Sequence, residues 1–211
     1  MQRNAAAKPA ASPFEFSGGA LCLDFANTVN HRPAAHRQEL LTDFAVLVAW
    51  SREARLLSEA QARDVLRRMS HAHAKAQAAL HRAQSLREVI YSVCSAAAAK
   101  RPPDVQQLAA LNRLLAEILA HSSLEPRGSG FAWAHPDEGQ PIDGVLWAVA
   151  RSAADLLTSD ALAQVRECAA TNCGWLFLDR SKNGSRRWCD MKVCGNRAKV
   201  QRFRRRARKT H

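Results

Sequence analysis

The chain carries CAATNC at residues 168–173 and CDMKVC at residues 189–194, so that its last four cysteines follow a C-x4-C-x15-C-x4-C spacing. A structural zinc ion takes four thiolate or imidazole ligands in a tetrahedron, and a close pair of cysteines supplies two of them from one tight turn. Two such pairs fill the coordination sphere and leave no position for a catalytic water. The spacing therefore predicts one structural Zn²⁺ bound by Cys168, Cys173, Cys189 and Cys194.

The alternative for these thiols is disulfide formation, which is typical of secreted proteins. Residues 1–13 (MQRNAAAKPAASP) are rich in Ala and Pro but lack the continuous apolar core of a secretory signal. No stretch of the chain approaches the roughly 20 apolar residues of a membrane span. We therefore expect a cytoplasmic protein that does not enter a membrane, with metal-binding thiols and a disordered lead over residues 1–13.

The residues between the two cysteine pairs predict a β-hairpin. Trp175–Leu178 has the composition of a strand, Asp179–Ser185 holds the Asn-Gly turn signal, and Arg186–Trp188 is the expected return strand. Cys194 then opens a helical stretch. A turn that carries two cysteines, a hairpin and a helix in this order are typical of a treble-clef finger.

Charge is concentrated at the C-terminal end of the chain. Residues 180–211 hold thirteen Lys or Arg and a single acid, Asp190, whereas residues 1–179 hold 18 bases and 18 acids. The formal net charge of +12 thus lies entirely in the last part of the chain, and four thiolates with one Zn²⁺ lower the charge of the whole finger by only two. A polyanion is the expected partner.

The expected C-terminal helix has two kinds of face. Val200, Phe203 and Ala207 share one side, so we expect them to pack onto the zinc hairpin near its two tryptophans. A neighbouring flank carries arginines, which grip phosphate or guanine with two hydrogen bonds, and Gln201, which can read adenine. The candidate nucleic-acid-binding residues are Arg186, Arg187, Arg197, Lys199, Gln201, Arg204, Arg205 and Arg208.

Three stretches resemble the CGNR zinc finger of bacterial proteins. They are Arg166–Asp179, Ser185–Cys189 and Cys194–Lys199, the last of which begins with the letters CGNR. Upstream, the run LCLDFANT at residues 21–28, together with Gly18-Gly19, is similar to the ABATE domain that usually precedes this finger. Members of this family are described as stress-induced transcription regulators, so the resemblance implies zinc-dependent DNA binding.

Periodicity upstream of the finger predicts a mainly α fold, with a multihelical ABATE-like domain over residues 14–160 and the finger over residues 161–211. Ser58, followed by Gln61, resembles a capping box that opens a long helix. The expected helices run from 43 to 54 with Thr42 as the cap, from 58 to 101 with a break near Gln84 and Ser85, from 104 to 121, and from 142 to 157. Residues 122–137 suit a short strand or an ordered loop.

The upstream half offers no nucleophile with an identifiable base, so we do not expect an enzyme. Asp24, Asn27 and Arg32 are candidate residues of a ligand pocket, and Gly18-Gly19 before a helix could present N–H groups to an anion. The simpler alternative is a turn followed by the polar edge of a helix. An enzyme tethered to nucleic acid is a weaker third hypothesis.

Two functions follow from these patterns. The first is a transcription regulator whose basic helix binds duplex DNA, while the helical domain senses a small molecule, dimerises, or does both. Dimerisation is expected because one finger buries little surface. The second is an RNA-binding or ribosome-associated zinc module without sequence preference, whose basic end is an electrostatic anchor.

Overall fold

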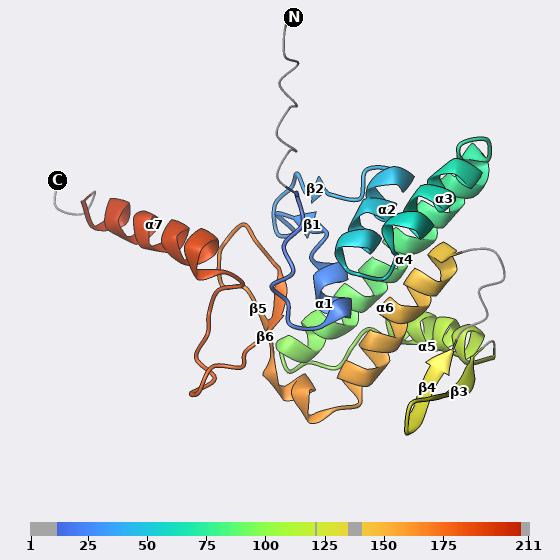
Figure 1. The fold of residues 1–211 in the computed structure, drawn as a ribbon. Coiled ribbons are helices and arrows are strands. Elements are labelled where there is room, and N and C mark those ends of the chain that lie inside the picture. Colours follow the sequence, from blue (N-terminus) through green and yellow to red (C-terminus); the bar gives the residue numbers. More distant parts are fainter. Residues whose placement is uncertain (1–11, 121, 135–140, 208–211) are drawn as a thin grey trace, which may run out of the picture.

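The computed structural model of the protein describes residues 12–120, 122–134 and 141–207. Within them the chain is mainly helical, and its strands form three antiparallel pairs (Figure 1). The helices are α1 (Leu21–Ala26), α2 (Phe44–Glu53), α3 (Glu59–Met69), α4 (His73–Ala98), α5 (Val105–Ala120), α6 (Pro141–Leu157) and α7 (Asn196–Ala207). The paired strands are β1 (Val29–Asn30) with β2 (Gln38–Glu39), β3 (Ser123–Arg127) with β4 (Gly130–Ala134), and β5 (Val165–Glu167) with β6 (Leu176–Leu178).

Helix α4 is the central element of the helical core. Its buried apolar residues, among them Leu80, Ala83, Leu86 and Ile90, recur every three or four positions. This spacing places them on one side of the helix. Helices α1, α2, α5 and α6 contact α4, so most of the helical domain packs around this one helix (Figure 1).

Local capping explains several helix ends. The predicted capping box is confirmed, because the Ser58 hydroxyl accepts a hydrogen bond from the N–H of Gln61 and the Gln61 side chain accepts one from the N–H of Ser58. The helix predicted to begin at Asp104 is also confirmed, since its carboxylate accepts a bond of 2.9 Å from the N–H of Gln107. Residues 123–134 form the β3–β4 hairpin, while residues 135–137 of that predicted segment lie outside the described residues.

Two helix boundaries were predicted wrongly. Asp43, not Thr42, caps α2, because its carboxylate accepts the backbone N–H three residues on. The long helix is interrupted at residues 70–72, between α3 and α4, and not near Gln84 and Ser85. The residues around Gln84 lie in the buried part of α4, where packing against its neighbours keeps the helix continuous.

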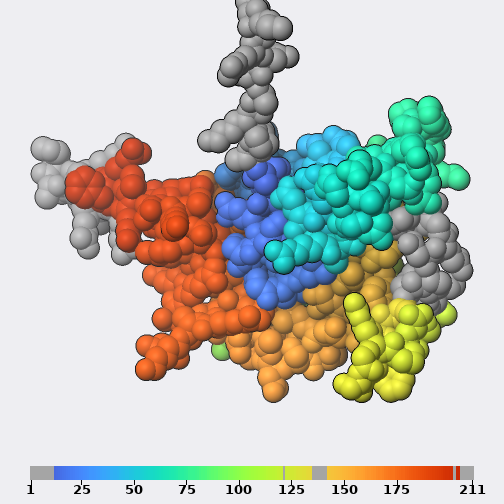
Figure 2. Space-filling view, in the orientation of Figure 1, coloured from blue at the N-terminus to red at the C-terminus, as the bar shows by residue number. Residues whose placement is uncertain are grey.

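The predicted finger shares a hydrophobic core with the helical domain. Val165 of β5 and Leu176 and Leu178 of β6 belong to the same buried cluster as the helices. A second, smaller cluster contains Trp175, Phe177 and the four cysteines. In the space-filling view, the finger abuts the N-terminal segment directly (Figure 2).

The predicted hairpin of the finger has a different partner strand. Leu176 to Leu178 do form a strand, but it pairs with β5, in the register Val165 to Leu178 and Glu167 to Leu176. The predicted return strand, Arg186–Trp188, has no regular secondary structure. The Asn-Gly signal lies instead in a loop, where Gly184 has φ +58°.

Helix α7 projects from the body of the molecule (Figure 1). It follows a π-helical turn over Met191–Gly195. The prediction that Val200 and Phe203 pack onto the finger is wrong, because these side chains are 49% and 74% exposed. The side chain of Ala207 is not described. In the described part of the chain no helix combines the length and apolar character of a membrane span.

Candidate zinc centre and nucleic-acid interface

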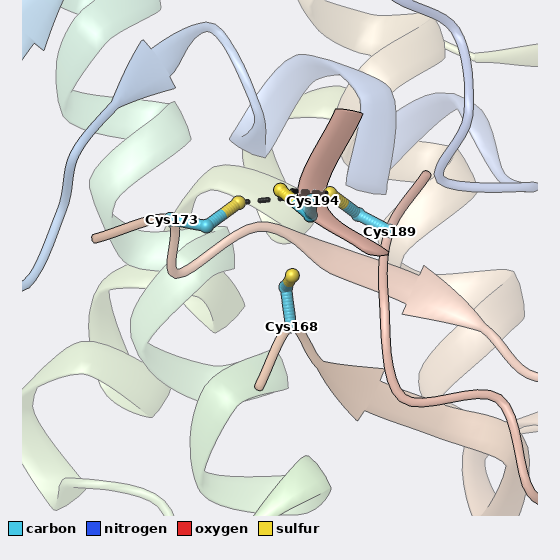
Figure 3. Close-up of side chains that lie close together, drawn as sticks. All are labelled: Cys168, Cys173, Cys189 and Cys194. Carbon is cyan, nitrogen blue, oxygen red and sulfur yellow. Dashed lines mark hydrogen bonds between the residues drawn. The ribbon is translucent and has the colours of Figure 1, made fainter. Parts of the chain in front are cut away.

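Three segments of the finger bring the four cysteines together (Figure 3). Cys168 directly follows β5, and the turn after it carries Cys173, whose N–H donates to the carbonyl of Ala170 at 3.1 Å. Cys189 directly follows the loop of residues 179–188, and Cys194 lies in the π-helical turn. All four side chains are buried, at 7% exposure or less.

The sulfur positions fit a tetrahedral zinc ion. The four Sγ atoms lie within 4.8 Å of one another, and the Cys173–Cys189 and Cys189–Cys194 sulfurs are 3.6 Å apart. Zinc–sulfur bonds of about 2.3 Å in a tetrahedron place the sulfurs about 3.8 Å apart. The predicted ligand set therefore forms one site that can hold one structural zinc ion.

The electrostatics of the site also favour a cation. A hydrogen bond with the Cys168 sulfur raises the pKa of both Cys173 and Cys189, and burial raises the pKa of Cys194. Hydrogen bonds from Cys173 and Cys189 lower the pKa of Cys168. Four thiolates in this buried space repel one another without a counter-ion, whereas a divalent metal stabilises all of them.

The loop before Cys189 is folded around Asp179. Its carboxylate accepts hydrogen bonds from the backbone and hydroxyl of Ser181 and from the backbone N–H of Arg186 at 2.9 Å. The bond from the Ser181 hydroxyl lowers the pKa of Asp179. Arg186 in turn donates to the carbonyls of Trp188 and Cys189. Asp179 and Arg186 thus shape the approach to the third zinc ligand.

Several hydrogen bonds attach the turn of residues 168–173 and the start of β6 to the helical domain, among them one between the His31 ring and the carbonyl of Asn172 at 2.9 Å. The carboxamide of Asn27 bonds the backbone N–H and carbonyl of Leu176, both at 2.8 Å. The indole N–H of Trp175 donates to the carbonyl of Val29 at 3.0 Å, and the backbone N–H of Arg32 donates to the carbonyl of Cys173 at 3.2 Å.

Gly174 lies at the centre of this contact between the finger and residues 27–33, which we call the joint. Its φ of +74° is strained for any other residue, and a Cβ atom there would lie 2.9 Å from the Cβ of Arg32 and 3.1 Å from Pro33. The close approach of the two backbones therefore requires glycine. Gly184 also has a positive φ, but a Cβ atom there would have nothing within 4 Å. A side chain at Gly184 would therefore strain the backbone without meeting a neighbour.

The three residues predicted to line a ligand pocket have partners within the protein. Asn27 is 2% exposed and bonded to Leu176. The Arg32 guanidinium pairs with Glu88 at 2.9 Å, donates to the Ala26 carbonyl and stacks on the ring of Tyr91. The Asp24 carboxylate accepts the N–H of Gly18 at 2.7 Å, and burial raises its pKa to about 6. Each of the three side chains thus bonds a neighbouring segment of the protein, and a ligand pocket at these residues stays a prediction.

The predicted nucleic-acid-binding residues fall into three groups. Arg186 is bound to the finger backbone, and Arg197 is partly buried and donates to the Asn172 side chain at 3.3 Å. The exposed group contains Arg187, Lys199, Gln201 and Arg204. Arg205 lies in α7 but its side chain is not described, and Arg208 lies outside the described residues.

Sequence reasoning missed Asp179, Gly174 and Trp175 as residues that build the site. A signal existed for Asp179, because an aspartate two residues before a serine at the start of a loop is typical of an Asx turn. The role of Gly174 depends on a segment more than 140 positions earlier in the chain, so no local pattern reveals it.

The fold and the four-thiol site define a zinc-finger protein with a helical N-terminal domain. The chain belongs to the ABATE family, described as "putative stress-induced transcription regulator", whose model matches residues 19–160. Residues 164–207 match the model of the CGNR zinc finger. Both matches confirm the resemblances read from the sequence. No curated protein matches the chain.

Proposed function

We propose that this zinc-binding regulator binds duplex DNA through α7 and the loop of residues 179–188. The observation that carries the proposal is the distribution of charge. The residues after 179 carry a net charge of +12, whereas residues 1–179 carry equal numbers of basic and acidic side chains. Since phosphate contacts supply most of the affinity of non-specific DNA binding, this basic end has the charge that such binding needs.

The two basic segments leave the same end of the molecule (Figure 1). Arg180, Lys182 and Arg187 in the loop are exposed, as are Lys199 and Arg204 on α7. A helix of 12 residues fits the major groove of B-DNA, and a basic loop beside it can contact the phosphate backbone. In this arrangement Gln201 faces the bases, Arg204 contacts phosphate, and the loop fixes the position of the helix.

The zinc ion has a positioning role in this proposal. Cys189 directly follows the loop and a single residue separates Cys194 from α7, so the same metal orders both basic segments. We propose further that the protein acts as a dimer, because one short helix buries too little surface for tight specific binding. Sensing of a small effector by the helical domain remains part of the proposal, without an assigned site.

The test is binding of the zinc-loaded full chain to random-sequence duplex DNA and to structured RNA at two salt concentrations, followed by sequencing of the bound molecules. A recovered duplex motif supports the proposal. Salt-sensitive binding without a motif, or a preference for RNA, supports the sequence-independent RNA-binding module instead. Arg113→Ala, an exposed arginine on α5, is the control variant and should bind like the wild type.

A further inference from the structure

Helix α7 exposes apolar side chains that nothing in the described chain covers. Phe203 is 74% exposed and Val200 49% exposed, and Val193 in the preceding turn is 42% exposed. Val200 and Phe203 are three positions apart, so their side chains are neighbours on the helix surface. The remaining residues from 196 to 207 are mostly Lys and Arg. A phenylalanine that is 74% exposed adds little burial energy to the fold, so its side chain is available to a partner.

The apolar strip, defined as Val200 and Phe203, shares its side of the helix with a cation. Arg204 is four positions after Val200 and directly follows Phe203, and it is also exposed. A partner that covers the strip therefore meets positive charge beside it. This combination favours a partner with apolar groups set between negative charges.

A second copy of α7 does not meet this requirement. The helix carries no acidic residue and six Lys or Arg between residues 196 and 207, so two copies packed together would repel each other. Duplex DNA does meet it. The floor of its major groove presents the C5-methyl group of thymine, the one apolar group among the hydrogen-bonding edges, and phosphates line both sides.

We propose that Val200 and Phe203 contact thymine methyl groups in the major groove while Arg204 binds an adjacent phosphate. This assignment rests on the proposed function, since it names what the DNA-binding helix recognises. It makes the apolar strip a determinant of sequence preference, whereas the basic residues mainly determine affinity.

The test uses DNA in which deoxyuridine replaces thymidine, because uracil pairs like thymine but lacks the methyl group. Wild-type protein should bind thymine-containing duplexes about tenfold more tightly than their uracil counterparts. The double variant Val200→Ser/Phe203→Ser should bind both kinds of duplex with equal affinity. Val105→Ser, which changes an 81% exposed valine on α5, is the matched control and should keep the wild-type preference.

The outcomes separate this inference from the proposed function. Equal wild-type binding to thymine and uracil duplexes overturns the inference but leaves DNA binding intact, whereas no DNA binding at all overturns the proposed function. Two further results assign the strip to another partner and overturn the inference. One is a wild-type dimer that the double variant converts to a monomer in sedimentation, and the other is a preference for unpaired RNA that the double variant loses. Unchanged thermal unfolding of the double variant confirms that it is folded.

Discussion

The side-chain amide of Asn27 bonds both the N–H and the carbonyl of Leu176, at 2.8 Å each. Leu178, two residues on, donates its N–H to the carbonyl of Gly18 at 2.8 Å. Successive residues of a strand direct their backbone groups to opposite edges, and residues two apart direct them to the same edge. The edge of β6 that faces away from β5 is therefore bonded to the segment around α1. The helical domain thereby supplies the missing neighbour of a zinc-finger strand.

Asn27→Ala should lower the free energy of unfolding by about 3 kcal/mol, because it leaves the N–H and carbonyl of Leu176 buried without partners. Denaturant unfolding of the zinc-loaded protein measures this. Asn30→Ala is the matched control, since Asn30 makes an exposed bond to Gln38 and its loss should cost less than about 0.5 kcal/mol. Equal effects of the two variants would contradict the role assigned to Asn27.

Gly174→Ala should cost more stability than Gly184→Ala, although both glycines have positive φ. The strain of a positive φ alone costs about 1 kcal/mol, which is the effect expected at Gly184. At Gly174 the added methyl also displaces Arg32, so the total should be about 3 kcal/mol. Thermal and denaturant unfolding of both variants compares them, and similar losses would show that the joint accommodates the methyl group.

Removal of zinc should destabilise α1 and the residues that follow it, in addition to the finger. The reason is that Val165, Leu176 and Leu178 lie in the core of the helical domain and metal binding contributes to the folding of the finger. Hydrogen exchange with and without a chelator should show lost protection at residues 18–32. Unchanged protection there would mean that the joint holds without the metal. Cys189→Ser provides the same comparison without a chelator.

Asp24 should make the protein less stable as pH rises. Burial raises the pKa of its carboxyl group from 3.8 to about 6, so the folded state binds the proton more tightly than the unfolded state does. Its contribution is present below pH 3.8 and is lost as pH rises through 6, by about 2 kcal/mol after allowance for partial exposure. The difference in unfolding free energy between wild type and Asp24→Asn, measured from pH 4.5 to 7.5, isolates this group. A difference that does not change with pH would contradict the shift.

Arg204→Ala and Gln201→Ala should affect DNA binding differently. Loss of the arginine removes a positive charge, so binding should weaken on all sequences and depend less on salt. Loss of the glutamine should change the preferred sequence with a smaller change in affinity. Sequencing of the DNA bound by each variant measures the preference. Identical uniform losses in both variants would indicate that α7 contacts phosphate alone.

The sequence predicted the parts of the site that depend on residue type and spacing. Two close cysteine pairs supply four metal ligands whatever lies between the pairs, and the predicted site is confirmed. The capping box at Ser58 depends only on residues three positions apart, and it is confirmed too. The return strand of the finger hairpin, Arg186–Trp188, was predicted wrongly because Asn183-Gly184 is a strong turn signal, yet that loop is folded by the hydrogen bonds of Asp179 and Ser181. The exposure of Phe203 was also missed, since helical periodicity identifies an apolar face but not what covers it.

The position of Gly174 against Arg32 and Pro33 limits how this finger can be inherited or transplanted. A genetic exchange that moved residues 164–207 into another protein would leave the edge of β6 and the outer side of Gly174 without their matching surface. Recombination should therefore keep the finger together with the segment around residues 18–33, and substitutions in one should be matched by substitutions in the other. Engineered chimaeras of such proteins should be cut outside both segments.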